Sequence, residues 1–538
     1  MTTIDWIIIA VYMAGLIALS VFLGRGQEGE EDYYVGGRDL PWWAVGVSTM
    51  ATQASVISFI SIPAFVAAKP GGGLTWLQYE LAVPLAMIFV MVVLVPFFRE
   101  LKLVSVYEYL EMRFSRSVRL LLSATFLISR GLGTGVGVYA TAVVLETVTG
   151  LPIWGLVLFV GIITIIYDTI GGMKAVVWSD VVQMIILILG VGISIWYAVD
   201  IAGGWAAIFE SFPDDRWRAL DPGTGIVSGK DVDMGQPLWA YLIGGFFLYA
   251  SYYGVDQSQA QRELSAPTLA DTKKSLVFNG LARFPMTCLY LLLGLAVGAA
   301  IAKSPALSAA ISGGSVDKLI PTFVVDVLPG GIRAVIIAAM LAAAMSSLDS
   351  ALNSLSAATM RDFLHKEGQT SAQLLRQSKI TTVVWGIMIT LAGLLFAAFA
   401  EKDSPVIEVI NKVGAAFYGP ILATFTAGVL SKKVTGRGVV FGLFVGLAAN
   451  LVLFVGPQIS DGFVVVHWMW WNAVGFVIAM VVAFLASGAP EAGKDEYVLT
   501  FENLTERERP WLKTYGILVA MFAAILLVGW LANQVAAG

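Results

Sequence analysis

The chain has 538 residues, of which 58% are hydrophobic and only 13% are charged. Soluble domains carry about 25% charged residues, so this composition excludes a soluble protein and indicates one that crosses a membrane many times. The net charge of -5 contains no basic block of the kind that binds nucleic acid, and the single cysteine, Cys288, excludes an intrachain disulfide and a cysteine-ligated metal.

Fourteen apolar segments are long enough to cross a bilayer, which takes about 20 residues in a helix. The predicted spans are 4–24, 41–68, 74–98, 117–147, 152–170, 174–200, 237–258, 275–302, 330–362, 379–400, 405–430, 437–457, 464–487 and 511–534. The first carries acidic Asp5 where a signal peptide has a basic region, so we expect a retained span. With the N-terminus outside, most Lys and Arg residues fall in inner loops, and the positive-inside rule therefore predicts both termini outside.

Two of these spans are predicted to be broken. The second mixes polar residues and a proline with its apolar residues, namely Thr52, Gln53, Ser55, Ser58 and Pro63. Span 237–258 is interrupted in a related way by Gly254 and Asp256. A broken helix exposes backbone carbonyls, which is tolerated at membrane depth only beside a cavity or an ion. Breaks at corresponding places in two halves are typical of inverted-repeat transporters with a site near the bilayer midplane.

Charged residues also lie inside other predicted spans. Glu80 follows Gln78 in span 74–98, and the two bases are Arg130 and Arg283. Each is explained either by a structural ion pair or by contacts to solute hydroxyls or a carboxylate in a polar cavity.

The segment 342–356, AAAMSSLDSALNSLS, places several hydroxyls and a carboxylate inside a predicted span. In a helix, Ser346 and Ser350 lie one turn apart, as do Asp349 and Asn353. Close helix packing explains serines and alanines alone, but Asp349 requires a cation or a proton.

Asp180 is another carboxylate just inside a span. Together with Asp349 and the hydroxyls it suits a hard cation, or else it caps a helix or pairs with a lysine such as Lys174. A proton relay needs only titratable groups. The many hydroxyls, together with the carbonyls of the broken span, therefore favour sodium.

Six motifs, taken in order, resemble the sodium/solute symporter family. They are EDYYVGGRDLPWWAVG, MATQASVISF, SVYEYLEMRF, YDTIGGMKAVVWSDVVQ, DQSQAQREL and AAAMSSLDSALNSLS, and they lie between about residues 31 and 430. The resemblance implies an all-α polytopic membrane protein with fourteen transmembrane helices and a leucine-transporter-like inverted repeat of two sets of five helices. The implied parts are an N-terminal extra helix with the start of a cytoplasmic loop (1–30), the first repeat (31–200), an extracellular loop (201–236), the second repeat (237–430) and three extra helices (431–538).

The resemblance also implies ion sites. The family's core sodium site corresponds to carbonyls at the break in the second span and to a carbonyl and two hydroxyls of the 330–362 span: Ala51, Ala54, Ala343, Ser346 and Ser347. Where members carry a second sodium, the matching residues are Asp180, Ser346, Asp349 and Ser350. Aspartate at 349 departs from the serine or threonine of that site, so the second ion is a sodium, is replaced by a proton, or is absent.

The implied solute contacts divide between two branches. In the sodium/glucose branch, matching residues are a hydroxyl-binding glutamate, a sugar-contacting lysine, an aromatic gate and an amide: Glu80, Arg283, Tyr252 and Asn411. Ser58 and Tyr249 depart from that branch, whereas ISFISIPA and Arg130 resemble sialic-acid and carboxylate carriers. The candidate substrate-binding residues are Gln53, Ser55, Ser58, Gln78, Glu80, Arg130, Tyr249, Tyr252, Tyr253, Arg283 and Asn411.

We therefore expect a transporter and not an enzyme: sodium-coupled symport, by alternating access, of a sugar, a polyol or a sugar acid such as sialic acid. The alternative is a sodium- or proton-coupled symporter of a monocarboxylate or amino acid, and a channel or non-transporting sensor is a remote one. Na+ is the coupling ion, and no other cofactor is expected. The expected partners are solute, sodium and membrane lipid, without nucleic acid or an obligate protein partner, in a bacterial inner membrane.

Overall fold

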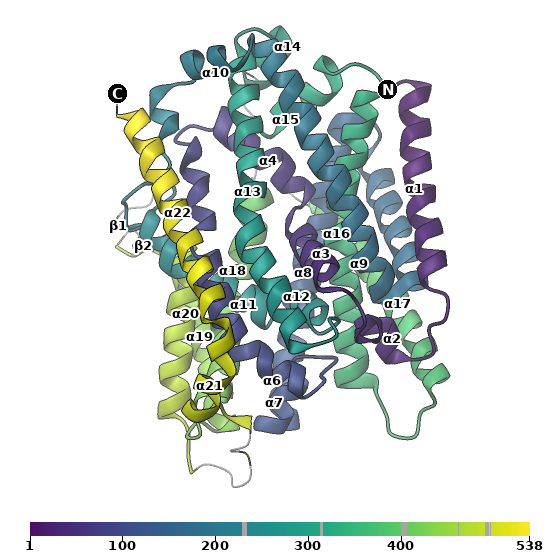
Figure 1. Cartoon of the computed structure of the whole chain (residues 1–538), viewed down its shortest axis with the longest axis vertical. Coiled ribbons are helices and arrows are strands. Elements are labelled where there is room, and N and C mark those ends of the chain that lie inside the picture. Colours follow the sequence, from purple (N-terminus) through teal and green to yellow (C-terminus); the bar gives the residue numbers. More distant parts are fainter. Residues whose placement is uncertain are drawn as a thin grey trace.

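The structure, a computed structural model, describes residues 1–228, 234–312, 316–399, 406–460, 462–489, 494 and 497–537, without the side chains of 317, 406–411, 413 and 501–503. Most of its long helices run along one direction as a bundle, and both termini lie at the same end (Figure 1). The helices, in chain order, are α1 (Thr3–Leu23), α2 (Glu30–Val35), α3 (Trp42–Gln53), α4 (Val56–Ala67), α5 (Val83–Phe89), α6 (Val95–Glu100), α7 (Glu108–Arg113), α8 (Arg116–Thr149), α9 (Ile153–Ala202), α10 (Trp205–Ser211), α11 (Gly245–Gly254), α12 (Gln257–Glu263), α13 (Leu269–Ile301), α14 (Pro305–Ser312), α15 (Leu319–Thr322), α16 (Ile332–Ala358), α17 (Ser371–Phe399), α18 (Val406–Leu430), α19 (Gly436–Ile459), α20 (Trp470–Leu485), α21 (Phe501–Glu508) and α22 (Leu512–Ala536). The 3-10 helix η2 (Leu74–Glu80) precedes α5, and the π-helical turns η5 (Ala240–Gly244) and η8 (Thr359–Leu364) adjoin α11 and α16.

Within the described residues, nine helical segments are long and apolar enough to cross a membrane, and the bent pair α3 and α4 makes a tenth. The predicted spans 152–170 and 174–200 both fall in α9, which turns at Gly172, where φ is 56°. The continuously described part of α18 (Gly414–Leu430) and the helix α20 (Trp470–Leu485) form two shorter apolar stretches. The molecule is thus a helical membrane protein, and the count of fourteen is not confirmed.

Both predicted breaks are confirmed. Helix α3 ends at Gln53 and α4 begins at Val56, with a bend of 60° between them. The Ser55 hydroxyl caps α4 by accepting a hydrogen bond from the Ser58 backbone amide at 3.3 Å. Helix α11 ends at Gly254, and Asp256 caps α12 by accepting the Ser258 amide at 2.9 Å. Polar caps therefore satisfy backbone groups that the breaks leave free.

Two short strands depart from the all-helical prediction. Strand β1 (Ile226–Ser228) lies in the segment 201–236 and pairs antiparallel with β2 (Val464–Val466), with Ile226 opposite Val466. The predicted span 464–487 is therefore wrong at its start, because β2 occupies those residues and α20 begins at Trp470. The pairing satisfies backbone N–H and C=O groups of two loops that are far apart in sequence but adjacent in space.

Helix α16 lies inside the bundle, whereas α1 and α22 lie at its edges (Figure 1). In the most apolar 18-residue stretch of the span that contains α16, 89% of the residues are buried. In the corresponding stretch of α1 only 22% are buried. Exposed apolar side chains such as Ile7 in α1 and Leu531 in α22 suit contact with lipid. Since α16 packs on α9, α8 and α1, its polar residues are enclosed by other helices.

Candidate functional site

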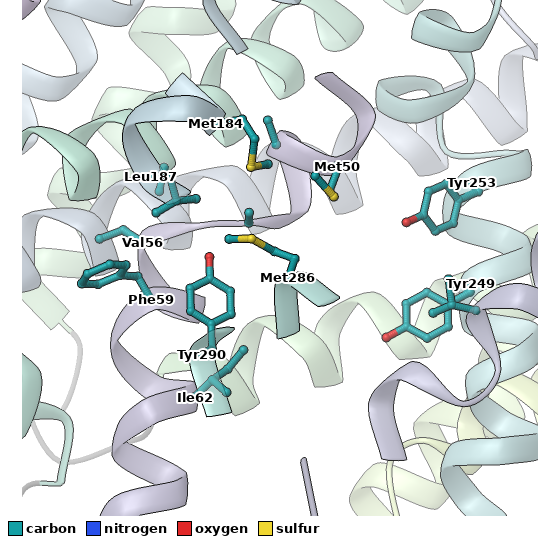
Figure 2. Close-up of a cluster of buried hydrophobic side chains, with 14 of the residues drawn as sticks. Met50, Val56, Phe59, Ile62, Met184, Leu187, Tyr249, Tyr253, Met286 and Tyr290 are labelled. Carbon is teal, nitrogen blue, oxygen red and sulfur yellow. The ribbon is translucent and has the colours of Figure 1, made fainter. Parts of the chain in front are cut away.

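A cavity of about 340 Å³ lies beside the break between α3 and α4. This volume is at the lower end of the range for small-molecule sites. Met50, Met286 and Tyr290 face it, and across it stands Tyr249 from α11 (Figure 2). Its wall is thus an apolar surface with a limited number of polar groups, the usual composition of a small-molecule site.

One polar cluster joins η2, α13 and α11 at this wall. The Glu80 carboxylate accepts a hydrogen bond from the Arg283 guanidinium at 2.7 Å and another from the Thr287 hydroxyl at 3.0 Å. Arg283 also donates to the Tyr249 hydroxyl at 3.0 Å, and its guanidinium lies 4.6 Å from the centre of that ring. Glu80 is almost fully buried, so its charge depends on Arg283 for compensation.

A second polar cluster joins α8 to the break after α11. The Arg130 guanidinium lies 3.7 Å from Asp256, which is an ion pair but longer than a hydrogen bond. Among the described residues, the buried Arg130 Nε has no hydrogen-bonding partner. Both residues line the cavity, so Arg130 keeps donor capacity for an anionic group there.

Most of the predicted substrate-binding residues line this one cavity. They are Gln53, Ser55, Ser58, Glu80, Arg130, Tyr249, Tyr252 and Arg283. Gln78 does not: its amide donates to the Thr75 and Gln236 carbonyls and accepts from the Asp221 amide, so it ties η2 to the segment 201–236. Tyr253 lies behind the wall with a buried hydroxyl that has no partner in the described structure. The Asn411 side chain lies outside the described residues.

The residues of the predicted core sodium site come together at the break. Ser346 donates to the carbonyls of Ala51 at 3.0 Å and Ala343 at 3.2 Å. Ser347 donates to the Thr52 carbonyl at 2.9 Å and to Ala343 at 3.4 Å. Ala54 is the first residue after α3, next to the bend. Carbonyl and hydroxyl oxygens, the ligands that hard cations prefer, therefore converge between α3 and α16.

The residues of the predicted second ion site also lie together, beside neighbours that were not predicted. Ser350 donates to the Ser346 carbonyl at 2.5 Å and to Asp349 at 3.3 Å. Asp180 lies 3.3 Å from the Arg262 guanidinium, which also hydrogen-bonds Ser350. Asp180 therefore pairs with Arg262 and not with Lys174, the lysine suggested by sequence proximity.

Three residues that were not predicted contact the two carboxylates of this predicted site. Ser48 donates to Asp180 at 2.5 Å, Tyr167 donates to Asp349 at 2.8 Å, and Arg262 supplies the positive charge. Arg262 is the arginine of the motif DQSQAQREL, and its presence in that motif was the one signal that pointed to it. Its position could not be predicted, because the break before α12 redirects the chain.

The chain is similar to known membrane transporters. The model of the "Sodium:solute symporter family" matches residues 33–446. The chain is 29% identical to the sodium/sialic acid symporter SiaT of Proteus mirabilis (strain HI4320), covering 85% of this chain and 90% of that protein. It is also 29% identical to the sodium/glucose cotransporter of Vibrio parahaemolyticus (84% and 86% covered) and to the sodium-coupled monocarboxylate transporter 1 of Xenopus laevis (85% and 73% covered).

Among solved structures, the chain is similar to a substrate-bound, outward-open Na+-coupled sialic acid symporter. The TM-score is 0.78 at 25% identity, over 91% of this chain and 99% of that one. These matched proteins are transporters and not enzymes.

Proposed function

Because the chain belongs to the sodium:solute symporter family and is thus a sodium-coupled transporter of the membrane, we propose that its solute is a sugar, a polyol or a sugar acid such as sialic acid. Solute and sodium would cross together by alternating access. The observation that carries this proposal is the cavity beside the helix break, where Glu80, Arg283 and Tyr249 present acceptors and donors. A sugar offers hydroxyls that can both donate to the carboxylate and accept from the guanidinium.

A monocarboxylate or an amino acid is the second candidate. Arg130 supports it, because its buried Nε has no partner in the described part of the chain and its pair with Asp256 is loose. A carboxylate of the solute would complete its hydrogen bonds. A sugar acid would use both clusters, which is why it remains among the first candidates.

The core sodium would bind at the carbonyls of Ala51, Ala54 and Ala343 and the hydroxyls of Ser346 and Ser347. The hydroxyls already point at the break, so an ion would exchange existing hydrogen bonds for coordination without a large rearrangement. The proposal requires only that these oxygens turn toward a common centre.

A second sodium is proposed at Asp180, Ser346, Asp349 and Ser350. Arg262 now contacts two of these residues, so a sodium there would have to displace its guanidinium. The ratio of solute accumulation to the imposed sodium gradient distinguishes the possibilities. A second sodium gives a squared dependence that persists in Asp349→Ser, since serine restores a hydroxyl ligand. A proton gives a linear sodium dependence with accumulation that follows the pH gradient and is lost in Asp349→Ser.

The membrane arrangement is also a proposal. We infer inverted repeats at 31–200 and 237–430, with 1–30, 201–236 and 431–538 outside them, and both termini on the outer side of a bacterial inner membrane. Single cysteines near each terminus, introduced after Cys288→Ala, would react with a membrane-impermeant maleimide in intact cells. Labelling only after lysis would contradict the orientation.

Uptake into proteoliposomes tests the function directly. A panel of radiolabelled sialic acid, glucose, a polyol, a monocarboxylate and an amino acid is offered with an inward sodium gradient, with an equal potassium gradient as control. We expect concentrative, saturable uptake of a sugar or sugar acid only with sodium. Uptake restricted to the monocarboxylate or amino acid would establish the second candidate instead.

A further inference from the structure

Asp168 is a buried carboxylate that neither the solute cavity nor the two ion sites use. It lies in α9 just before the turn at Gly172 and has no exposed surface. Neither carboxylate oxygen has a hydrogen-bonding partner among the described residues. An ionised carboxylate in such a place is far less stable than a neutral one, because nothing replaces the water it has lost.

The Asn353 amide lies beside the Asp168 carboxyl, and its orientation follows from its own neighbours. Gln261 donates its Nε2 to the Tyr34 carbonyl at 2.6 Å, which fixes that nitrogen. The same nitrogen donates to Asn353 Oδ1 at 2.8 Å, so the free end of Asn353 is its Nδ2. An N–H group there does not suit a metal cation, which needs several oxygen ligands, but it can donate to a carboxyl oxygen whether or not the carboxyl carries a proton.

The surrounding charges do not compensate Asp168. The titratable groups that face it or lie around it come from α9, α16, α12, α2 and α17: Tyr167, Asp180, Asp349, Arg262, Tyr33, Tyr34 and Lys379. Arg262 is bound to Asp180, and Lys379 lies over the Tyr33 ring, 5.9 Å from its centre. Two other carboxylates in the same region make a third negative charge still less favourable.

A short helix covers this carboxyl. Tyr33 and Tyr34 of α2 are fully buried, and the Tyr33 hydroxyl reaches the Asp168 carbonyl at 3.4 Å and Thr382 at 3.0 Å. Gln27, in the linker before α2, donates to the Gly171 carbonyl at 2.7 Å. Helix α2 lies near the end of the bundle opposite the two termini (Figure 1), so its displacement would open a route from that side to Asp168.

We propose that Asp168 is a proton-binding site, separate from the solute cavity and from both sodium sites. Its carboxyl holds a proton while α2 covers it, and releases the proton to water at that end of the bundle when α2 moves away. The site does not depend on sodium coupling or on the identity of the solute.

Infrared spectroscopy of the purified full chain at neutral pH tests the proton directly. The carbonyl stretching band of a protonated carboxyl should be present in the wild type, and one such band should be lost in Asp168→Asn. Asp200→Asn is the matched control, because Asp200 lies on the same helix but is exposed. Asp168→Glu should shift the band without removing it, which covers the case in which the asparagine variant does not fold. Loss of a carboxylate band in Asp168→Asn, or an unshifted spectrum in Asp168→Glu, would overturn the proposal.

Hydrogen–deuterium exchange of residues 30–35 tests the role of α2. An ionised Asp168 is more stable in water than beneath α2, so rising pH should open α2 in the wild type. After correction for intrinsic exchange, the protection of the α2 amides should fall by up to about tenfold per pH unit, starting from the pH at which an uncovered Asp168 ionises. In Asp168→Asn that excess dependence should disappear. Identical pH profiles in the two proteins would refute the release route.

Discussion

Ser346 and Ser347 are neighbours in sequence, yet their hydroxyls reach different carbonyls of the broken helix, those of Ala51 and Thr52. This is possible because α3 ends at Gln53, so the carbonyls of its last turn lack the full set of amide partners that a continuing helix would supply. Each serine also bonds back to Ala343, so each hydroxyl is held in place before an ion arrives. At the scale of single residues, the proposed sodium site is a pair of hydroxyls held against backbone carbonyls at the helix break.

Replacing one of these hydroxyls should weaken sodium binding. Ser347→Ala removes one proposed ligand, and we expect the sodium concentration for half-maximal uptake to rise roughly tenfold, the effect of about 1.4 kcal/mol. Ser354→Ala is the control, because Ser354 is buried on the same helix and, among the described residues, donates to the Ala351 carbonyl alone. Equal sodium dependence in both variants would remove Ser347 from the site.

Glu80 either contacts the solute or serves only in a structural ion pair with Arg283, and a substitution distinguishes the two roles. Glu80→Gln keeps the size but removes the charge that Arg283 and Thr287 contact. If Glu80 binds solute hydroxyls, solute binding should weaken by about 1.5–3 kcal/mol while sodium binding stays nearly unchanged. Binding can be followed by scintillation proximity, with Glu210→Gln at an exposed position as control. Normal solute affinity together with a lower melting temperature would identify a structural pair.

At the scale of elements, α9 and α16 carry the proposed second ion site, and their contact depends on a glycine. A Cβ built at Gly190 of α9 would lie 2.7 Å from the Ala339 Cβ of α16, closer than real carbon atoms approach. Gly192, two residues later, has nothing within 4 Å of such a Cβ. The pair therefore separates the effect of packing from the effect of removing a glycine.

We expect Gly190→Val to destabilise the protein by about 1–3 kcal/mol through overpacking. Gly192→Val changes the intrinsic helix propensity in the same way without the clash. Thermal unfolding in detergent, followed by circular dichroism, should show a lower midpoint only for Gly190→Val. Matching midpoints would mean that α9 and α16 do not approach as closely as the structure has them.

At the scale of the whole molecule, the proposed core sodium site joins α3 and the break after it to α16, so sodium should stabilise the assembled bundle. A ligand that binds only the folded state at 100 times its dissociation constant adds about 2.7 kcal/mol. We expect sodium, but not potassium, to raise the unfolding midpoint, and the transported solute to raise it further. In Ser346→Ala the sodium effect should shrink. A midpoint equally sensitive to both cations would argue for an effect of ionic strength alone.

Much of the architecture is readable from local sequence. Long apolar runs predict most of the observed helices, because a segment in lipid must satisfy its backbone hydrogen bonds within itself. Polar interruptions located both breaks, since Ser55 and Asp256 are helix-capping residues in places where apolar residues would continue the span. Motif order identified the family, and residue type marked Glu80, Arg283 and Asp349 as unusual in a membrane.

Tertiary structure alone decided which polar groups meet. Sequence proximity suggested Lys174 for Asp180, but Arg262 arrives from α12, 82 residues later in the chain, after the break before that helix. Gln78 was expected in the solute cavity, but its amide binds loop backbone instead. Strand β2 replaced the start of a predicted helix because it pairs with β1, more than 200 residues away. Apolar periodicity reports how each segment satisfies its own backbone, whereas these side-chain and strand pairings depend on where the bends send the next helix, which no local pattern records.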